Sequence, residues 1–386
     1  MEKDDKDFGD LEKEQFNVVA FTWNCAGQLP PEEDFGKFLQ WKDNTESPDI
    51  LFLGFQEVVQ LGIMSMLNGL GKYQINDFGD RITEDLKILY DEEYTVFTFE
   101  CMMGLLLLAV CKSNIFDKIS NIDKSQVPLG FGRTIGNKGA VLIRFLLNRT
   151  SIVCACCHLQ SGKEKYHKRV KHWYDITELA FENYDRDNSF NKHQVQFFMG
   201  DLNFRVQHPY EETIELLNGI NDENKQETIQ FLFNRDQLSL LTNDFPWLKE
   251  YKEMKVDFLP TYKYDKESDI YDTSDKMRVP SWCDRILWRE KDGENEEIEN
   301  YCIPVSYERR ESLFSDHRPV IAKFKVYTDK YSTACGEEDE CDQKFDTTKK
   351  FPSYDPDKNK SISKQLDTED ISPFKHSKTR EESELD

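Results

Sequence analysis

The sequence predicts an α+β fold in which β-sheets pack on each other and helices cover them. Apolar runs with strand character recur along residues 16 to about 328, and amphipathic segments lie between them. The two kinds of segment do not alternate in the regular order that builds a doubly wound parallel sheet. The 386 residues are 38% hydrophobic and 13% aromatic, which is enough for a sizeable core.

The expected strands are the apolar runs, and the expected helices are segments with apolar residues at helical spacing. We place strands at 16–23, 50–56, 94–101, 105–111, 140–145, 151–157, 196–200, 285–288, 301–305 and 320–327. We place helices at 35–42, 164–183, 209–218 and 226–241. In the longest of these, Trp173, Ile176 and Ala180 recur at helical spacing and predict one apolar face.

Composition divides the chain into three parts. We expect a charged N-terminal extension at 1–15, a folded domain at 16–330 and an acidic C-terminal tail at 331–386. In the tail, acidic residues outnumber basic ones and aliphatic residues are few. Such a segment buries too little apolar surface to offset chain entropy, so we expect it to be disordered.

The chain shows no membrane-crossing or secretory signal. Its first residues are charged, and its longest apolar run, 102–111, is too short to span a bilayer. Its ten cysteines lack the regular spacing of a disulfide framework, which indicates a reducing compartment. We therefore expect a cytoplasmic protein without a transmembrane segment, and a monomer.

The formal charge limits the classes of partner. Fifty basic residues against 73 acidic ones give a net charge of −23, which argues against nucleic-acid binding. Metal cations would be attracted by this field, and a local basic pocket could still accept an anionic substrate.

Polar residues follow several of the predicted strands. Asn24, Glu57, His158 and Asp201 each end an apolar run, and Ser315-Asp316-His317 stands just before the last strand. One such ending is a strand leaving the core. Five endings with acid, amide and imidazole groups predict one rim that handles phosphate or metal.

Each polar ending has a possible chemical role. Glu57 at a strand end suits a hard divalent ion, especially Mg²⁺, and Asn24 could hold a metal-bound water or a phosphate oxygen. Asp201 could accept a proton from an attacking water that Asn203 orients, although an Asx turn would also explain this pair. His317 needs a carboxylate partner from elsewhere, and our candidate is Asp284.

Two basic groups stand out in this acidic chain. Tyr262, Lys263, Lys276 and Arg278 lie in a loop-rich stretch before Asp284, and their cations could bind phosphate. Asn137 and Lys138 lie between two glycines that permit close backbone approach, although this string alone would be a turn.

Taken together, these segments resemble the catalytic domain of the inositol polyphosphate 5-phosphatases, within the endonuclease/exonuclease/phosphatase superfamily. The resemblance covers roughly residues 16 to 328, in the family order. It rests on TWNCAG at 22–27, FQE at 55–57, GNKG at 136–139, CHL at 157–159, GDLNFR at 200–205, PTYKY at 260–264, PSWCDRIL at 280–287 and SDHRP at 315–319. Phe204 departs from the family, which often has Tyr there.

The resemblance implies a four-layer αββα sandwich, as in deoxyribonuclease I, and Mg²⁺-dependent removal of an inositol 5-phosphate. Carried over by motif, the metal ligands are Glu57, Asn24 and Asp316. The catalytic residues are Asp201 as base, Asn203 for positioning, and His158 with the His317–Asp284 pair on the scissile phosphate. The 4-phosphate contacts are Tyr262, Lys263, Lys276 and Arg278, and Asn137 and Lys138 face the phosphate on the lipid side.

The resemblance also implies the partners and leaves alternatives open. The expected partners are phosphoinositides at a membrane surface, reached by peripheral association, or soluble inositol phosphates. The sequence does not rank these substrates. We also expect Leu129 and Phe131 to touch the membrane. The alternatives are a nuclease of the same superfamily, a catalytically silent lipid-binding module and, more distantly, a metal-dependent sphingomyelinase.

Overall fold

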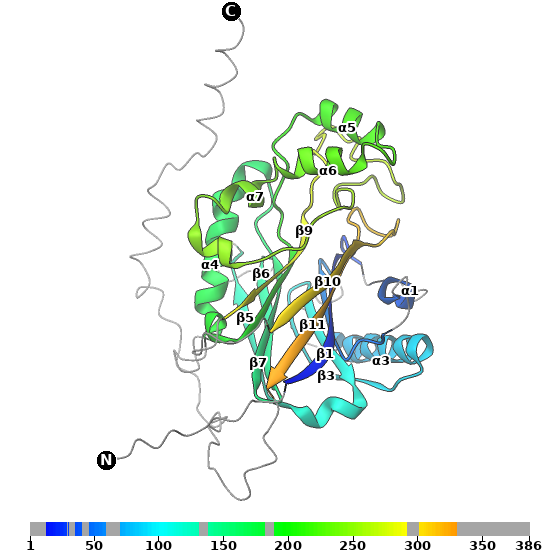
Figure 1. Cartoon of the computed structure of the whole chain (residues 1–386). Helices are drawn as coiled ribbons and strands as arrows, with labels where there is room; N and C mark the ends of the chain where they lie inside the picture. Colours follow the sequence, from blue (N-terminus) through cyan, green and yellow to red (C-terminus); the bar gives the residue numbers. More distant parts are fainter. Residues whose placement is uncertain are drawn as a thin grey trace, which may run out of the picture.

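The computed structural model describes residues 13–28, 30, 35–40, 46–58, 70–130, 138–181, 189–291 and 301–329. Within these ranges, the strands form one six-stranded and one five-stranded sheet. The two sheets lie face to face, and helices cover both outer faces (Figure 1). This confirms the predicted α+β class and the four-layer arrangement.

The six-stranded sheet has the order β10-β11-β1-β2-β4-β3. Strands β1 and β2 pair in parallel, and every other pair in this sheet is antiparallel. Its strands are β1 (Lys13–Asn24), β2 (Ile50–Gln56), β3 (Tyr94–Met102), β4 (Leu105–Lys112), β10 (Cys302–Arg309) and β11 (Val320–Asp329).

The five-stranded sheet has the order β5-β6-β7-β8-β9. Strands β7 and β8 pair in parallel, and the remaining pairs are antiparallel. Its strands are β5 (Ile119–Pro128), β6 (Gly139–Leu147), β7 (Thr150–His158), β8 (Val195–Asp201) and β9 (Asp284–Glu290).

The helices lie outside the sheets. The α-helices are α1 (Phe35–Leu39), α3 (Leu70–Tyr90), α4 (Tyr166–Leu179), α5 (Tyr210–Asn218), α6 (Lys225–Phe233) and α7 (Gln237–Leu241). Short 3₁₀ segments are Ser113–Lys118, Lys163–Lys165, Phe190–Lys192 and Pro246–Glu250. Helices α1 and α3 cover the six-stranded sheet, and α4 and α7 cover the other (Figure 1).

Three apolar cores separate the four layers. The central core joins the facing sides of the sheets and includes Phe52, Phe145 and Phe197. A second core packs α4 onto the five-stranded sheet, where the Trp173 ring stacks on Phe198 with centroids 4.0 Å apart. The burial of Trp173, Ile176 and Ala180 confirms the predicted apolar face of this segment.

The structure corrects several element boundaries. The single helix expected at 226–241 is two helices, because Asp236 accepts hydrogen bonds from the backbone N–H groups of Leu238 and Ser239 and starts α7 anew. The helix expected at 164–183 is shorter and ends at Leu179. Strand β1 begins at Lys13, opposite Asp329, so residues 13–15 belong to a strand and not to an extension. Residues 1–12 and 331–386 lie outside the described part.

The sequence prediction missed β5 and α3. Strand β5 is the edge of its sheet and reads ISNIDKSQVP, with mostly exposed polar residues in place of an apolar run. In α3, the apolar face of Ile75, Phe78, Ile82 and Leu86 has helical spacing, but Gly79 interrupts it. A Cβ at Gly79 would lie 3.0 Å from the Val96 side chain of β3, so the helix packs closely on the strand at this position.

In the described ranges, none of the helices is both long enough and apolar enough to cross a bilayer. The cysteines in these ranges are free.

Candidate active site

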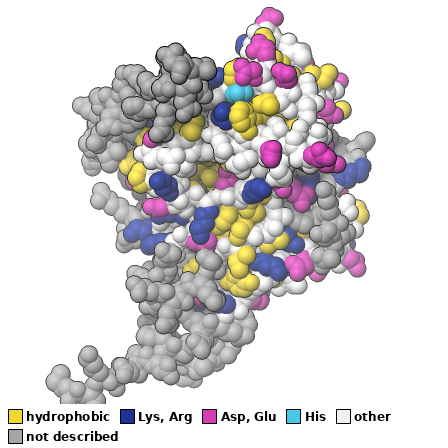
Figure 2. Space-filling view, turned by 45° about the horizontal axis from the view of Figure 1, so that its top comes forward, with side chains coloured by type: hydrophobic (Ala, Val, Ile, Leu, Met, Phe, Trp, Pro, Cys, Tyr) yellow, Lys and Arg dark blue, Asp and Glu magenta, His cyan; other side chains and the backbone are white. Residues whose placement is uncertain are grey.

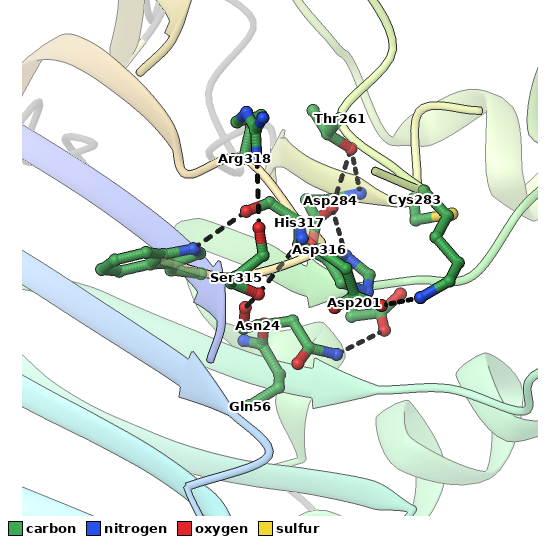
Figure 3. Close-up of polar contacts among 12 residues, drawn as sticks. Asn24, Gln56, Asp201, Thr261, Cys283, Asp284, Ser315, Asp316, His317 and Arg318 are labelled. Atoms are coloured by element: carbon green, nitrogen blue, oxygen red, sulfur yellow. Dashed lines mark hydrogen bonds and ion pairs between the residues drawn. The ribbon is translucent and has the colours of Figure 1, made fainter. Parts of the chain in front are cut away.

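Two rows of polar residues end the strands of the two sheets at the same edge of the sandwich. In the five-stranded sheet, His158 pairs with Asp201, and Asp201 pairs with Asp284 across β7, β8 and β9. In the six-stranded sheet, Asn24 at the end of β1 pairs with Gln56, the neighbour of Glu57. A hydrogen bond of 3.0 Å from Asn24 Nδ2 to Asp201 Oδ2 joins the two rows (Figure 3).

The carboxylate of Asp201 lies at the centre of the junction. Besides Asn24, it lies 3.2 Å from His158 Nε2, and its Oδ1 accepts a 3.1 Å hydrogen bond from the backbone N–H of Asn203. Burial alone would raise the pKa of Asp201. The His158 hydrogen bond and the positive charges of His317, His158 and Lys138 outweigh it and hold the pKa well below its usual range. Asp201 is therefore ionised at neutral pH.

The imidazole of His317 is held by the predicted partner. Its Nδ1 lies 2.8 Å from Asp284 Oδ2, and the Thr261 hydroxyl donates a 2.7 Å hydrogen bond to the same oxygen (Figure 3). Burial lowers the pKa of His317, but the charge and hydrogen bond of Asp284, with Asp201 and Asp316, raise it to about 9. His317 therefore carries a proton at neutral pH.

His158 contacts the second basic group. Its Nε2 contacts Lys138 Nζ and lies 3.6 Å from Glu57 Oε1. Burial lowers the pKa of Lys138, and the negative charges of Asp201 and Glu57 oppose this shift. Of the two residues predicted between the glycines, Lys138 thus reaches the site, whereas Asn137 lies outside the described residues. Phe131 also lies outside them.

The Asx turn expected as an alternative to a functional Asn203 does form, but it does not exclude one. Asn203 has a φ of +59°, and its side chain donates a 3.3 Å hydrogen bond to the Leu159 carbonyl and accepts one from Arg205. Ala26 and Glu57 are also left-handed, with φ of +49° and +55°. Non-glycine residues rarely adopt this conformation, and here it turns the chain at three of the strand ends.

The predicted basic loop folds over His317. The Tyr262 ring lies 4.3 Å from the His317 ring, and Lys263 Nζ lies 2.5 Å from Asp316 Oδ2. The Arg278 guanidinium forms a 3.1 Å ion pair with the Asp272 carboxylate. The backbone N–H of Asp272 donates a 2.9 Å hydrogen bond to the Lys263 carbonyl. Lys276 is exposed farther along the same loop. Figure 2 shows several Lys and Arg side chains across the middle of the face on this side of the molecule.

Comparison with known proteins decides the family. The profile of the Endonuclease/Exonuclease/phosphatase family 2 matches residues 21–323. The chain belongs to the endonuclease/exonuclease/phosphatase family.

Within this family, the chain is similar to inositol polyphosphate 5-phosphatases. It is 32% identical over 311 residues to the polyphosphatidylinositol phosphatase INP53 of Saccharomyces cerevisiae, with 80% of this chain and 26% of the relative covered. It is 31% identical over 319 residues to the mouse type II inositol 1,4,5-trisphosphate 5-phosphatase, with 81% and 30% covered. The chain thus spans less than a third of the length of either relative.

A solved structure supports the same placement. The 5-phosphatase domain of a synaptojanin, crystallised with inositol 1,4-bisphosphate and a calcium ion, superposes with a TM-score of 0.68. The two are 28% identical, and the match covers 82% of this chain and 85% of that domain. The fold is therefore that of a 5-phosphatase domain of the endonuclease/exonuclease/phosphatase family.

The donor atoms of the site can be compared with those that a divalent cation requires. In the described part of the chain, Asp201, Asp284 and His317 place their ligand atoms within 4.8 Å of one another. His317 already supplies the positive charge there. Glu57 fits a hard cation better, because its side chain is 47% exposed at the same junction and offers a carboxylate.

Asn24 and Asp316 complete the predicted ligand set. Asn24 lies one strand away from Glu57, and its Oδ1 accepts a 3.0 Å hydrogen bond from the backbone N–H of Ala26, which leaves a second lone pair. Asp316 bonds to Lys263, so as a ligand it would share its carboxylate with that lysine. Carboxylate and amide oxygens such as these are ligands that a hard divalent cation accepts while it keeps several waters.

Several residues of this junction have no role assigned to them in the sequence analysis. Ser315 donates a 2.6 Å hydrogen bond to the Asn24 carbonyl (Figure 3). Trp23 Nε1 donates a hydrogen bond of 3.2 Å to the His317 carbonyl. Both tie the segment before β11 to the end of β1. Ser315 and Thr261 lie inside the quoted motifs, which is the signal that could have found them.

The expectation that Leu129 touches a membrane is wrong for this structure. Leu129 is buried and packs in the core between the five-stranded sheet and its helices.

Proposed function

We propose that this protein is a phosphoric monoester hydrolase that removes the 5-phosphate of phosphoinositides, and of soluble inositol polyphosphates. The observation that carries the proposal is the junction of an ionised Asp201 with a protonated His317, beside a loop that carries Tyr262 and Lys263. A base, a cation for the phosphate and a basic pocket for the rest of the substrate thus lie together.

In the proposed reaction, Asp201 orients the attacking water and accepts its proton. Its low pKa makes it a weak base before the reaction begins. Phosphoryl transfer needs little deprotonation of the water before the bond to phosphorus forms, because its transition state is loose. Asn203 lies beside Asp201 and would help to position the water.

The protonated His317 stabilises the negative charge of the transferring phosphoryl group. Asp284, which accepts a hydrogen bond from Thr261, fixes the ring, and the Tyr262 ring lies against it at a tilt of 35°. A buried charge that is already in place costs no reorganisation during the reaction. His158, beside Asp201, would contact the same phosphate.

The proposed cofactor is Mg²⁺, held by Glu57 and Asn24 with the help of Asp316. When bound, such an ion neutralises charge on the phosphate oxygens. The calcium ion in the synaptojanin domain supports a divalent cation in the family.

The proposed substrate pocket lies on the loop over His317. Tyr262, Lys263, Lys276 and Arg278 would contact the 4-phosphate, and Asn137 and Lys138 the phosphate on the lipid side. We propose peripheral action at the cytoplasmic side of membranes, and the free cysteines support a reducing compartment. The names of the relatives include both lipid and soluble substrates, which supports testing both.

The test is phosphate release from the 4,5-bisphosphate and 3,4,5-trisphosphate lipids in vesicles and from soluble inositol 1,4,5-trisphosphate. We expect release with Mg²⁺ and none with EDTA. A plasmid-nicking assay runs beside it. Nicking without release from any inositol substrate would move the assignment to a nuclease, and binding without release would indicate a silent lipid-binding module.

A further inference from the structure

Gln237 is a buried amide that joins three segments around the active site. It is the first residue of α7, lies on the side of the five-stranded sheet away from the central core, and is fully buried. Its Oε1 accepts hydrogen bonds from the guanidinium of Arg169 and, at 3.0 Å, from the backbone N–H of Arg205. Its Nε2 donates a 2.9 Å hydrogen bond to the Lys163 carbonyl. Both lone pairs of the amide oxygen are thus used.

One partner of Gln237 leads to Asn203. The guanidinium of Arg205 bonds to the Asn203 carbonyl at 3.2 Å and to the Asn203 Oδ1 atom. Gln237 fixes the backbone from which this guanidinium extends. Asn203 is the residue that we assign to positioning the attacking water.

The other partner leads to the segment after His158. The fully buried Arg169 donates hydrogen bonds of 3.0 Å to the Gln160 carbonyl and 2.7 Å to the Gly162 carbonyl. This segment includes Leu159, whose carbonyl accepts the hydrogen bond of Asn203. The two paths from Gln237 therefore meet at the Asn203 side chain.

We propose that Gln237 is a positioning residue of this active site, which holds Asn203 through Arg205 on one path and through Arg169 on the other. The inference rests on the proposed function, because it assigns Gln237 to the reaction of that site. Among the described residues, Gln237 makes no hydrogen bond to a group that we place on the substrate. Without its oxygen, the buried Arg169 guanidinium would lose one of its acceptors and the buried N–H of Arg205 would lose its acceptor, and we expect both segments to shift in response.

The backbone around Gln237 makes the idea testable in a folded protein. The backbone N–H of Gln237 donates a 3.0 Å hydrogen bond to the Arg205 carbonyl, and the backbone N–H of Gln207 donates one of 2.8 Å to the Arg235 carbonyl. These hydrogen bonds do not depend on the Gln237 side chain. We therefore expect Gln237→Met, which has a similar size and no amide, to fold.

The experiment compares Gln237→Met with Gln237→Glu and a matched control. Glu keeps the oxygen that Arg169 and Arg205 share and loses the donor to Lys163. The control is Gln196→Met. Gln196 is equally buried, and it lies near the start of β8, at the opposite end of this strand from Asp201. For each protein, the readouts are kcat and KM for inositol 1,4,5-trisphosphate, and amide hydrogen exchange of the segments 159–163 and 203–206.

We expect Gln237→Met to lower kcat about 10- to 100-fold with KM changed less than about 3-fold, as for residues that orient catalytic groups. Gln237→Glu should retain more activity than Gln237→Met, and Gln196→Met should match the wild type. In an Asn203→Ala background, Gln237→Met should have little further effect, because it acts through Asn203. A merely structural role would give equal losses in both backgrounds.

The outcomes separate this inference from the proposed function. Faster exchange in both segments of Gln237→Met, in a protein whose wild type releases no phosphate, would keep the positioning role and overturn the function. Wild-type kcat and exchange in Gln237→Met would overturn the positioning role. Should Gln237→Met fail to fold, Gln237→Leu, which also lacks the oxygen, takes its place, and wild-type kcat and exchange in that variant would also overturn the positioning role.

Discussion

At the scale of single residues, the site depends on charges that lie close together and stabilise each other. Asp201 and His317 carry opposite charges within one buried group, and Asp284 holds His317 from the other side. A buried charge is tolerated only when it is paired, so changing one member affects the others.

Asp201→Asn should lower kcat about a thousandfold. The change keeps the shape of the side chain and removes the group that accepts the proton, and general-base catalysis contributes effects of this size. Steady-state phosphate release from inositol 1,4,5-trisphosphate measures it. Asp222→Asn, on an exposed turn between α5 and α6, is the control. Near-normal turnover of Asp201→Asn would refute its assignment as base.

Glu57→Gln should raise the Mg²⁺ concentration for half-maximal activity about 10- to 100-fold, since an amide is a weaker ligand for a hard cation than a carboxylate. A second readout is the thermal unfolding midpoint, which Mg²⁺ should raise in the wild type and less in the variant. Glu93→Gln, a surface residue paired with Lys87, serves as the control. An unchanged Mg²⁺ dependence would remove Glu57 from the ligand set.

At the scale of elements, the strand ends place these residues because neighbouring strands approach closely there. Gly200, next to Asp201, has a φ of +138°, and a Cβ built on it would lie 2.0 Å from the Cys157 carbonyl oxygen of β7. The positive φ of Gly200 and the position of the Cys157 carbonyl oxygen are both features of the backbone, so a change of side-chain rotamer cannot relieve the clash.

Gly200→Ala should therefore destabilise the protein by about 3 kcal/mol or more, in the range of severe core changes. Urea unfolding followed by tryptophan fluorescence measures the loss. Gly36→Ala in α1, where the nearest atom would be 3.4 Å away, should change stability by less than about 1 kcal/mol. Equal effects of the two changes would contradict the close approach of β7 and β8.

His193 lies just before β8. Because of its titration, we expect the unfolding free energy to decrease as the pH falls below 7. Burial and the nearby charge of Arg144 lower the pKa of His193 from 6.5 to about 3. Between these values the unfolded chain binds a proton that the folded protein does not, so stability falls as the pH falls. The loss reaches about 2 kcal/mol at pH 5, from 1.36 kcal/mol per pH unit.

The measurement is the unfolding free energy of the wild type and of His193→Leu at pH 7 and pH 5. The wild type should lose about 2 kcal/mol more than the variant between these two values, by the same conversion. Parallel losses in the two proteins would show that His193 titrates alike in the folded and unfolded chain.

At the scale of the whole molecule, the two sheets and the three apolar cores are formed by residues between Lys13 and Asp329. These two residues pair with each other across β1 and β11. The first and last strands lie next to each other in the middle of the six-stranded sheet. The chain from 13 to 329 thus completes its own hydrogen-bonded sheets.

A protein that ends at residue 330 should therefore keep its stability and its activity on soluble substrate. We expect its thermal midpoint within about 2 °C of the full chain, which corresponds to a change of less than about 0.5 kcal/mol in the unfolding free energy. Differential scanning calorimetry and kcat for inositol 1,4,5-trisphosphate measure this. A large drop in either quantity would show that 331–386 contribute to the catalytic domain.

The strand ends of this molecule could be predicted from sequence, because buried strands are short apolar runs and their ends are marked by polar residues. The pairing of His317 with Asp284 was also predictable, since adjacent Asp316 points elsewhere. The contacts of Arg205, Arg169 and Gln237 were not, because they join residues distant in the chain through buried polar groups without a local pattern. Edge strand β5 lacks the apolar run that marks the others.

Hydrolysis at the 5-position can be tested by identifying the product that the enzyme forms. The wild type and Asp201→Asn are each incubated with Mg²⁺ and inositol 1,4,5-trisphosphate, and the bisphosphate formed is identified by chromatography against the three possible isomers. The wild type should form the 1,4-bisphosphate, and the variant should form almost none. Formation of the 1,5- or 4,5-isomer, or no bisphosphate from the folded wild type, would contradict hydrolysis at the 5-position.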